Sequence, residues 1–181
     1  MEIDKNALLN KYYSLFNNRE WEKAEKILLK LLENEPDNFW LLTSISSLKY
    51  EMKKYEESRE YSVLAYKLNP NSPLVLWDYA GVLFMLDEEE IAIEHLTKII
   101  DMGEIKVAFE ETTEGLKWAK SIINDSYFKI GQAHFYLNNL DKAKTFILIH
   151  LNNRKRGLKS LFKKIYVLNL LKDVGNELNE N

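Results

Sequence analysis

The chain has 181 residues, of which 46% are hydrophobic, and its formal net charge is −3. The hydrophobic content excludes wholesale disorder, and the length suits one domain or one short array of stacked units. The 6 Gly and 3 Pro are too few for a sandwich or barrel of many short strands and favour helices. The lack of Cys excludes a disulfide framework, a thiolate metal site and a cysteine nucleophile.

The N-terminal residues Met1-Glu2-Ile3-Asp4-Lys5 alternate in charge, and no apolar run follows them, unlike a secretory signal. The longest nearly apolar stretch, 79–86, has 8 residues, whereas a membrane-spanning helix needs roughly 20. We therefore expect no transmembrane segment and a cytoplasmic location. The pI of about 5.7 gives no overall attraction to nucleic acid.

A period of about 34 residues is the clearest pattern in the chain. Pro36 and Pro70 lie one such period apart, each within a stretch typical of a helix end followed by a helix start. Small and large apolar residues recur at the same offset, as two closely packed antiparallel helices require. These sets are Ala24, Ser58 and Ala92; Leu28, Ser62 and Leu96; Leu31, Ala65 and Ile99; and Leu8, Leu42 and Leu76.

The pattern resembles the tetratricopeptide repeat family, which has a small residue at position 8, Ala at position 20 and Pro at position 32. The repeats then fall at about 5–38, 39–72, 73–106 and 124–157, with an insertion at about 107–123. Position 8 is large in the first repeat, which predicts either a splayed first helix pair or an atypical cap. Position 8 is occupied by Tyr12, Ser46, Ala80 and Gly131, and position 20 by Ala24, Ser58, Ala92 and Ala143.

The resemblance implies an all-α fold, a right-handed solenoid of about four helix pairs in a single domain, 1–181. For the insertion we expect a loop at about 103–112, then one long helix from about 114 to 138. Thr112 or Thr113 could cap that helix. The insertion is explained either by slack in the array or by a loop that overhangs a binding groove. An apolar stripe predicts a further helix at about 158–178 that covers the last repeat.

In the tetratricopeptide family, positions 2, 5, 9, 12 and 13 of each first helix face a concave groove. Carried onto this chain, these positions are rich in aromatic residues and poor in charge, which favours a peptide or helix with apolar anchors as the partner. The function implied is that of a protein-binding adaptor or scaffold, unless the C-terminal helix fills the groove. The groove residues expected to bind are Tyr13, Phe16, Trp40, Tyr50, Trp77, Phe84, Phe128 and Phe135.

The segment 142–172 contains nine Lys or Arg and no Asp or Glu. It supports an alternative function, the binding of a polyanion such as nucleic acid or an anionic surface. No base-stacking platform or nucleic-acid motif accompanies it, so nucleic acid is the less favoured partner. Two other readings are a solvated cap and self-association through the basic C-terminal end. The candidate residues are Arg154, Lys155, Arg156, Lys159 and Lys163.

No arrangement of residues indicates catalysis, a metal or a cofactor. His95, His134 and His150 do not pair on one helical face, and two of them fall at packing positions of the repeat. There is no glycine-rich phosphate loop. We therefore expect no enzyme activity and no small-molecule substrate. Some members of the family clamp a C-terminal carboxylate with Lys and Asn, but this chain has Leu9, Tyr13, Ser47, Trp77 and Gly81 at those positions.

Overall fold

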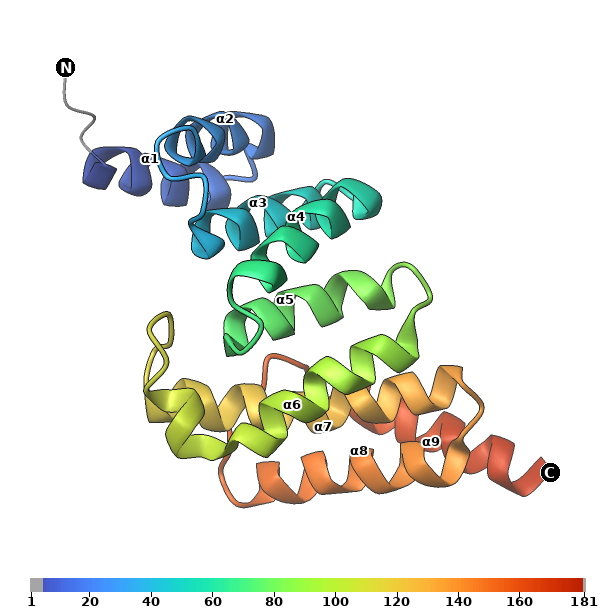
Figure 1. Ribbon diagram of the computed structural model, residues 1–181. Coiled ribbons are helices and arrows are strands. Elements are labelled where there is room, and N and C mark those ends of the chain that lie inside the picture. The colour runs from blue at the N-terminus through green and yellow to red at the C-terminus, as the bar shows by residue number, and fades with distance from the viewer. Residues whose placement is uncertain (1–4, 181) are drawn as a thin grey trace. The chain divides into compact units, whose positions relative to one another are not determined.

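A computed structural model describes residues 5–180, which form helices joined by turns with no strand among them. The chain divides into two compact units, Met1–Leu86 and Asp87–Asn181. Figure 1 shows helices α1 to α9 in chain order. This division differs from the single array expected from the sequence, because the third expected helix pair, 73–106, is shared between the two units.

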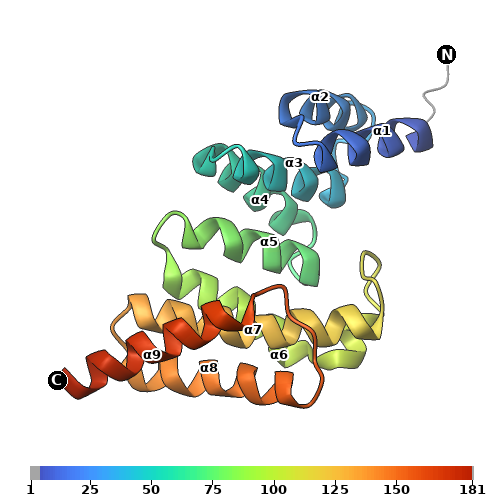
Figure 2. The ribbon, with the colours of Figure 1, turned by 180° about the vertical axis from the view of Figure 1, so that it is seen from behind.

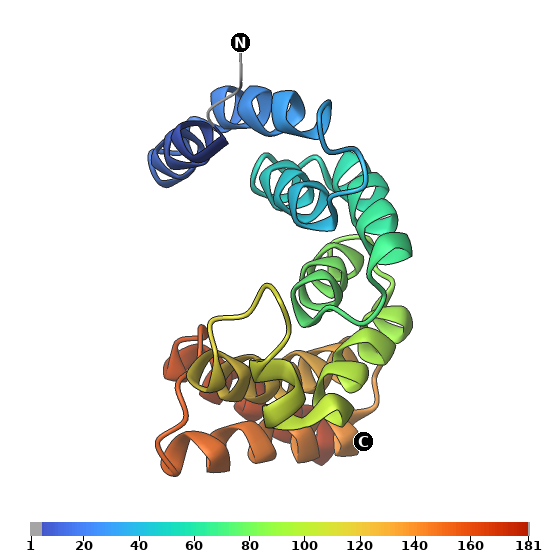
Figure 3. The ribbon, with the colours of Figure 1, turned by 60° about the vertical axis from the view of Figure 1, so that its left-hand side comes forward.

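The first unit contains helices α1 to α5, and α1, α3 and α5 each begin one repeat period after the last. Figure 3 shows these three helices on one side of the unit, with α2 and α4 on the other. The helices are α1 (Lys5–Asn17), α2 (Trp21–Leu32), α3 (Phe39–Glu51), α4 (Tyr55–Leu68) and α5 (Pro73–Phe84).

Local sequence explains where these helices start. The side chain of Asn38 accepts a hydrogen bond of 3.1 Å from the Leu41 amide, which otherwise lacks an intrahelical partner at the start of α3. Pro73 occupies the first turn of α5, where a residue without an amide hydrogen costs nothing.

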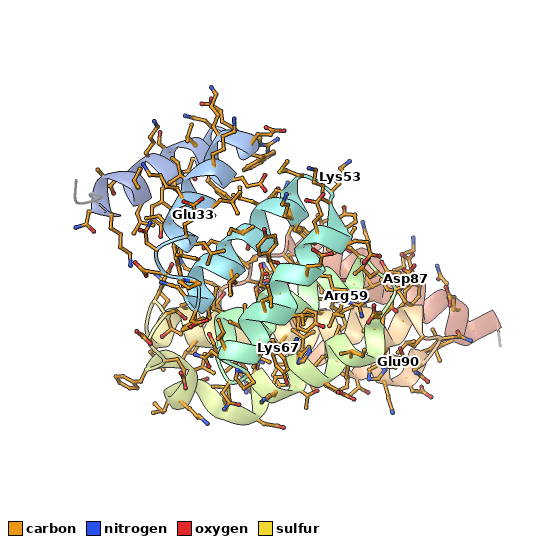
Figure 4. All side chains as sticks on the ribbon, turned by 45° about the horizontal axis from the view of Figure 1, so that its top comes forward. Glu33, Lys53, Arg59, Lys67, Asp87 and Glu90 are labelled. Atoms are coloured by element: carbon orange, nitrogen blue, oxygen red, sulfur yellow. The ribbon has the colours of Figure 1, made fainter. Side chains whose placement is uncertain are left out.

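Each turn between the two helices of a pair contains one non-glycine residue in the left-handed region. These residues are Arg19, Lys53, Asp87 and Asn138, with φ between 55° and 61°. The first three are spaced by the repeat period, and all four occupy position 15 of the repeat frame. Figure 4 labels two of them, Lys53 and Asp87, and both are exposed. The backbone thus repeats even where the residue type changes.

The core of the first unit lies between the helix pairs. Tyr12, which the sequence marked as too large for a close contact, is 5% exposed and belongs to the cluster formed by α1, α2 and α3. Lys49 is also buried, and its ammonium group lies 2.6 Å from the carboxylates of both Glu25 and Glu57. This bridge joins α2, α3 and α4, so neighbouring pairs are held by charge as well as by apolar contact.

The second unit contains α6 (Glu89–Ala108), α7 (Leu116–Tyr136), α8 (Leu140–Lys155) and α9 (Lys164–Glu180). α6 is broken at Gly103, where φ is 73°. The chain therefore leaves the first helical axis where the expected loop begins, but 104–108 returns to helix. Proline would prevent this, and the third repeat has Glu104 at the position of Pro36 and Pro70.

The long helix expected after the insertion is α7, but neither threonine caps it. Gly115, with φ of 80°, precedes its first residue and provides no side-chain cap. The Thr113 hydroxyl instead donates to the carbonyls of Ala108 at 3.0 Å and Glu110 at 2.8 Å. Thr113 therefore stabilises the turn that follows α6.

The C-terminal helix starts at Lys164, later than the expected 158. Segment 158–163 is held in a non-helical form by two contacts. The Leu161 amide donates to Asp125 Oδ2 at 2.8 Å, and the Arg154 guanidinium donates to the Phe162 carbonyl at 2.7 Å. α9 lies against α7 and α8 (Figure 2) and contributes Val167, Leu170 and Val174 to their core.

Candidate functional site

Six of the predicted groove residues belong to the first unit, on the helices α1, α3 and α5 that share one side of it (Figure 3). Tyr13 is 50% exposed, and the next residue after α5, Met85, is 42% exposed. The other five groove residues are partly buried, namely Phe16, Trp40, Tyr50, Trp77 and Phe84.

Aromatic contacts join some of these residues across helices. The rings of Tyr13 and Trp40 lie 6.4 Å apart at 61°, so a residue of α1 meets a residue of α3 edge to face. Phe16 and Trp40 also pack against the core of the first unit. Tyr50 instead contacts Tyr55 of its own helix pair, at 5.6 Å. Tyr13 and Trp40 thus form a rigid aromatic pair with one exposed member.

Gly81 leaves an opening on the surface of α5. An added Cβ at this position would have no heavy atom within 4 Å. Trp77 and Phe84 lie four residues before and three residues after Gly81, so the three share one helical face. The backbone of α5 is therefore approachable between two large aromatic residues.

The two remaining groove residues, Phe128 and Phe135, lie in the second unit under the C-terminal segment. Phe128 is fully buried, with ring contacts to Phe162 at 4.7 Å and Tyr166 at 5.7 Å. Phe135 is partly buried against the same core. A hydrogen bond of 2.7 Å from Gln132 to the Tyr166 hydroxyl adds a polar contact between α7 and α9. In this unit the chain's own tail covers the predicted groove position 128.

Asp125 anchors this covering segment from a fully buried position on α7. Burial raises the pKa of its carboxyl, against the opposing hydrogen bonds from Ser160 and the Leu161 amide. His150 lies nearby with Nδ1 2.9 Å from the Asn124 carbonyl, and burial lowers the pKa of its imidazole. Both shifts favour the neutral forms, so the 3.8 Å approach of Asp125 and His150 is not an ion pair.

His150 is fully buried, and His95 and His134 are 7% and 9% exposed, which confirms that His134 and His150 occupy packing positions. Within residues 5–180, no group of three or more His, Cys, Asp or Glu is placed to hold a metal ion. In the same part of the chain, no helix is both long and apolar enough to cross a membrane.

A polar cluster in the first unit was missed by the sequence analysis. The Asp78 carboxylate accepts hydrogen bonds from Ser46 at 2.7 Å and Ser47 at 2.5 Å, and Ser62 Oγ lies 2.7 Å from Ser46 Oγ. Burial raises the pKa of Asp78 to about 6, although the three hydroxyl groups oppose the change. The available signal was the pair Ser58 and Ser62 at positions where the other repeats have Ala, Leu or Ile.

The basic candidates lie at the end of α8 and in the segment that follows. Arg154 is partly buried through its bond to the Phe162 carbonyl, whereas the other four are exposed. No acidic side chain forms an ion pair with those four among the residues that the structure describes. They are Lys155, Arg156, Lys159 and Lys163.

Comparison with known proteins identifies two repeats. The family model described as tetratricopeptide repeat matches residues 41–72 and 125–148, which correspond to α3–α4 and α7–α8. No curated protein matches the sequence.

Solved structures share the fold at low sequence identity. MamA from Desulfovibrio magneticus RS-1 (residues 41 to end) has a TM-score of 0.77 and 13% identity over 99% of this chain and 88% of that one. PilF from Pseudomonas aeruginosa has a TM-score of 0.72 and 14% identity over 97% and 69%. The first repeat domain of Spaghetti (RPAP3), bound to the HSP90 peptide SRMEEVD, has a TM-score of 0.59 and 16% identity over 78% and 93%.

Proposed function

We propose that this tetratricopeptide-repeat protein is a protein-binding adaptor that captures a peptide or helical segment of its partner on α1, α3 and α5. The supporting observation is the face of α5, where the approachable backbone at Gly81 lies between Trp77 and Phe84. A bulky apolar residue of a partner could enter there and contact both rings. Aromatic residues supply much of the affinity of protein interfaces because they bury large areas with little loss of side-chain freedom.

The pair of Tyr13 and Trp40 supports a second anchor for the same partner. Edge-to-face packing already restricts both rings, so a bound segment does not have to order them. Leu9, Tyr13 and Ser47 stand where the family's carboxylate clamp has Lys or Asn. The partner therefore differs from the acidic chaperone tail that is bound to Spaghetti (RPAP3).

The second unit is not part of this binding surface. Phe128 is fully buried beneath Phe162 and Tyr166, so it offers no area to a partner while α9 stays in place. Of the concave positions in the family, only those of α1, α3 and α5 carry the proposal.

The test is selection of peptides from a displayed library with the purified full chain. Peptides with two or more bulky apolar residues should be enriched. Gly81→Leu, which fills the opening, and Trp77→Ala, which removes one wall, should each weaken a selected peptide by about 2 kcal/mol, or about 30-fold. Circular dichroism should show that both variants keep their helices.

Leu64→Gln is the matched control, because Leu64 is an exposed apolar residue of α4, on the opposite side of the unit. It should bind the peptide as the unchanged chain does. Equal affinity for Gly81→Leu and the unchanged chain would refute binding at α5.

A second candidate function is polyanion binding through segment 142–172. It is supported by the four exposed basic residues without acidic partners, Lys155, Arg156, Lys159 and Lys163. Retention on heparin should fall steeply with salt and be lost when Arg154, Lys155 and Arg156 are neutralised. Retention no stronger than that of a chain with all nine basic residues of the segment replaced by Gln would exclude it.

A further inference from the structure

A cavity of about 730 Å³ lies in the second unit between the C-terminal half of α8, segment 157–160 and the start of α9. The two helices run in opposite directions there, as both Figure 1 and Figure 2 show. The volume falls within the range of about 300–1,000 Å³ that is typical of small-molecule sites. The cavity is separate from the peptide-binding surface proposed above, which lies in the first unit.

One end of the cavity is apolar. Leu148 and Leu151 contribute from α8, and Leu168 and Leu171 contribute from α9. Residues three apart lie on the same face of a helix, so each helix presents two leucines to the space between them. Leu148 is 39% exposed and Leu168 is 41% exposed, so α9 leaves this apolar wall partly uncovered.

The other end of the cavity is basic. Arg154, Lys155, Lys159 and Lys164 line it, and no Asp or Glu does. Arg154 is held by its bond to the Phe162 carbonyl. The three lysines are exposed, and none forms an ion pair within the described part of the chain. An anion placed among them would meet several positive charges and no competing carboxylate.

The order of the residues separates the two ends. Lys155 and Lys164 adjoin the connecting segment, whereas Leu148 and Leu171 lie seven residues away from them along their helices. Seven residues of helix extend for about 10 Å. The cavity therefore has charge at one end and about two helical turns of apolar wall leading away from it.

We propose that this cavity binds a single-chain fatty-acid anion. The carboxylate lies among Lys155, Lys159 and Lys164, and the alkyl chain extends between the leucines of α8 and α9. A bare polyanion would leave the leucines unused, and a neutral apolar molecule would leave the lysines unused. A ligand with one anionic head and one apolar tail uses both, and its chain is of medium length because the wall is about 10 Å long.

The first experiment titrates the full chain with decanoate below its micelle concentration, followed by calorimetry and by backbone amide shifts of residues 157–160. Decanoate should bind and shift those amides. Decanol lacks the charge, acetate lacks the tail, and decyltrimethylammonium reverses the charge, so each should bind at least tenfold more weakly. Equal binding of decanol and decanoate would overturn the proposal, because the lysines would then have no role.

The second experiment separates the two ends by mutation. The double variant Lys159→Glu and Lys164→Glu should weaken decanoate at least tenfold, as should Leu168→Gln. The matched controls are Lys144→Glu, in the same basic segment but outside the cavity, and Ile165→Gln, an apolar residue of α9 that is 63% exposed and does not line it. Both controls should bind decanoate normally, and circular dichroism checks that all variants fold.

Three results would overturn the proposal. The first is an equal loss with Lys144→Glu, which would indicate a general effect of charge. The second is unchanged decanoate binding by Leu168→Gln, which would place the tail elsewhere or point to a polyanion site. The third is displacement of decanoate by an acidic, leucine-containing helical peptide that binds more tightly than decanoate, which would assign the cavity to a protein segment.

Discussion

In α3 and α4, three serines meet where the two helices approach each other, and they hydrogen-bond to one another and to Asp78. In α7 and α8, the residues at the same three repeat positions are Gly131, Ala143 and Ile147, which meet by direct contact. The family pattern thus requires a small volume at the contact and not an apolar one. Polar groups are accepted there because each buried hydroxyl has a partner.

The two contacts should respond to different disturbances. The contact in the first unit contains a carboxyl group whose pKa lies within an accessible pH range, so its strength depends on pH. The contact in the second unit contains no titratable side chain, and its atoms are already as close as they can be. It should therefore depend on side-chain volume and not on pH.

The largest expected effect is that of Gly131→Ala. An added Cβ would lie 2.8 Å from Ile147 Cγ1 and 3.1 Å from the Ala143 carbonyl oxygen and the Ile147 amide nitrogen. Two of these atoms are backbone, so α7 and α8 would have to separate. We expect the free energy of unfolding of the second unit to fall by about 2–3 kcal/mol, measured by amide hydrogen exchange in α7 and α8.

Gly175→Ala in α9 is the control for this change, because its Cβ would have no heavy atom within 4 Å. Alanine favours the helix over glycine by up to about 1 kcal/mol, so this variant should be more stable than the unchanged chain. If both variants were stabilised, the close contact at Gly131 would be wrong.

The next effect is a pH dependence that Asp78→Asn should remove. Burial raises the pKa of Asp78 from 3.8 to about 6 in the folded chain. The folded state therefore holds this proton more tightly, and the stability it contributes is present below the ordinary pKa and lost as pH rises through about 6. Between pH 4 and 7, the unchanged chain should lose on the order of 2 kcal/mol relative to Asp78→Asn.

The measurement is chemical unfolding of both proteins at several pH values, followed by amide exchange in α3 and α4. The difference between the two proteins matters, since other carboxyl groups titrate equally in both. A difference that stays constant from pH 4 to 7 would mean that Asp78 is not desolvated in the folded chain.

The smallest effect is that of Gly81→Ala, which sharpens the contrast with Gly131. Both glycines lie within first helices, at positions 9 and 8 of their repeats, yet an added Cβ meets nothing at Gly81. We expect this variant to gain about 0.5–1 kcal/mol in stability, visible as a higher melting temperature by circular dichroism. A loss of stability would show that the surface of α5 is covered and not approachable.

The repeated helix pairs could be predicted from the sequence because their small residues recur in register. Ala24, Ala92 and Ala143 are all fully buried, as position 20 requires. The start of α9 could not be predicted in this way. The apolar spacing of segment 158–163 suits a helix, but Asp125, far earlier in the chain, takes the Leu161 amide, and local patterns do not report such a contact.

The candidate site was predictable to the same extent. Position in the repeat correctly places Tyr13, Trp40 and Trp77 on the first helices of their pairs. For Phe128 the repeat position was not sufficient, because the stripe of α9 predicts a covering helix without specifying which rings it covers. The role of Asp78 depends on three hydroxyl groups from two other helices, which only the assembled unit brings together.

The left-handed turn residues have a consequence for the history of such chains. Four turns keep one torsion angle while their residue is Arg, Lys, Asp or Asn, yet the family model matches only two of the four segments. Torsion angles have thus outlasted residue identities as a record of duplication. Positive φ values at regular intervals would align repeats in chains whose sequences have diverged beyond the reach of residue comparison.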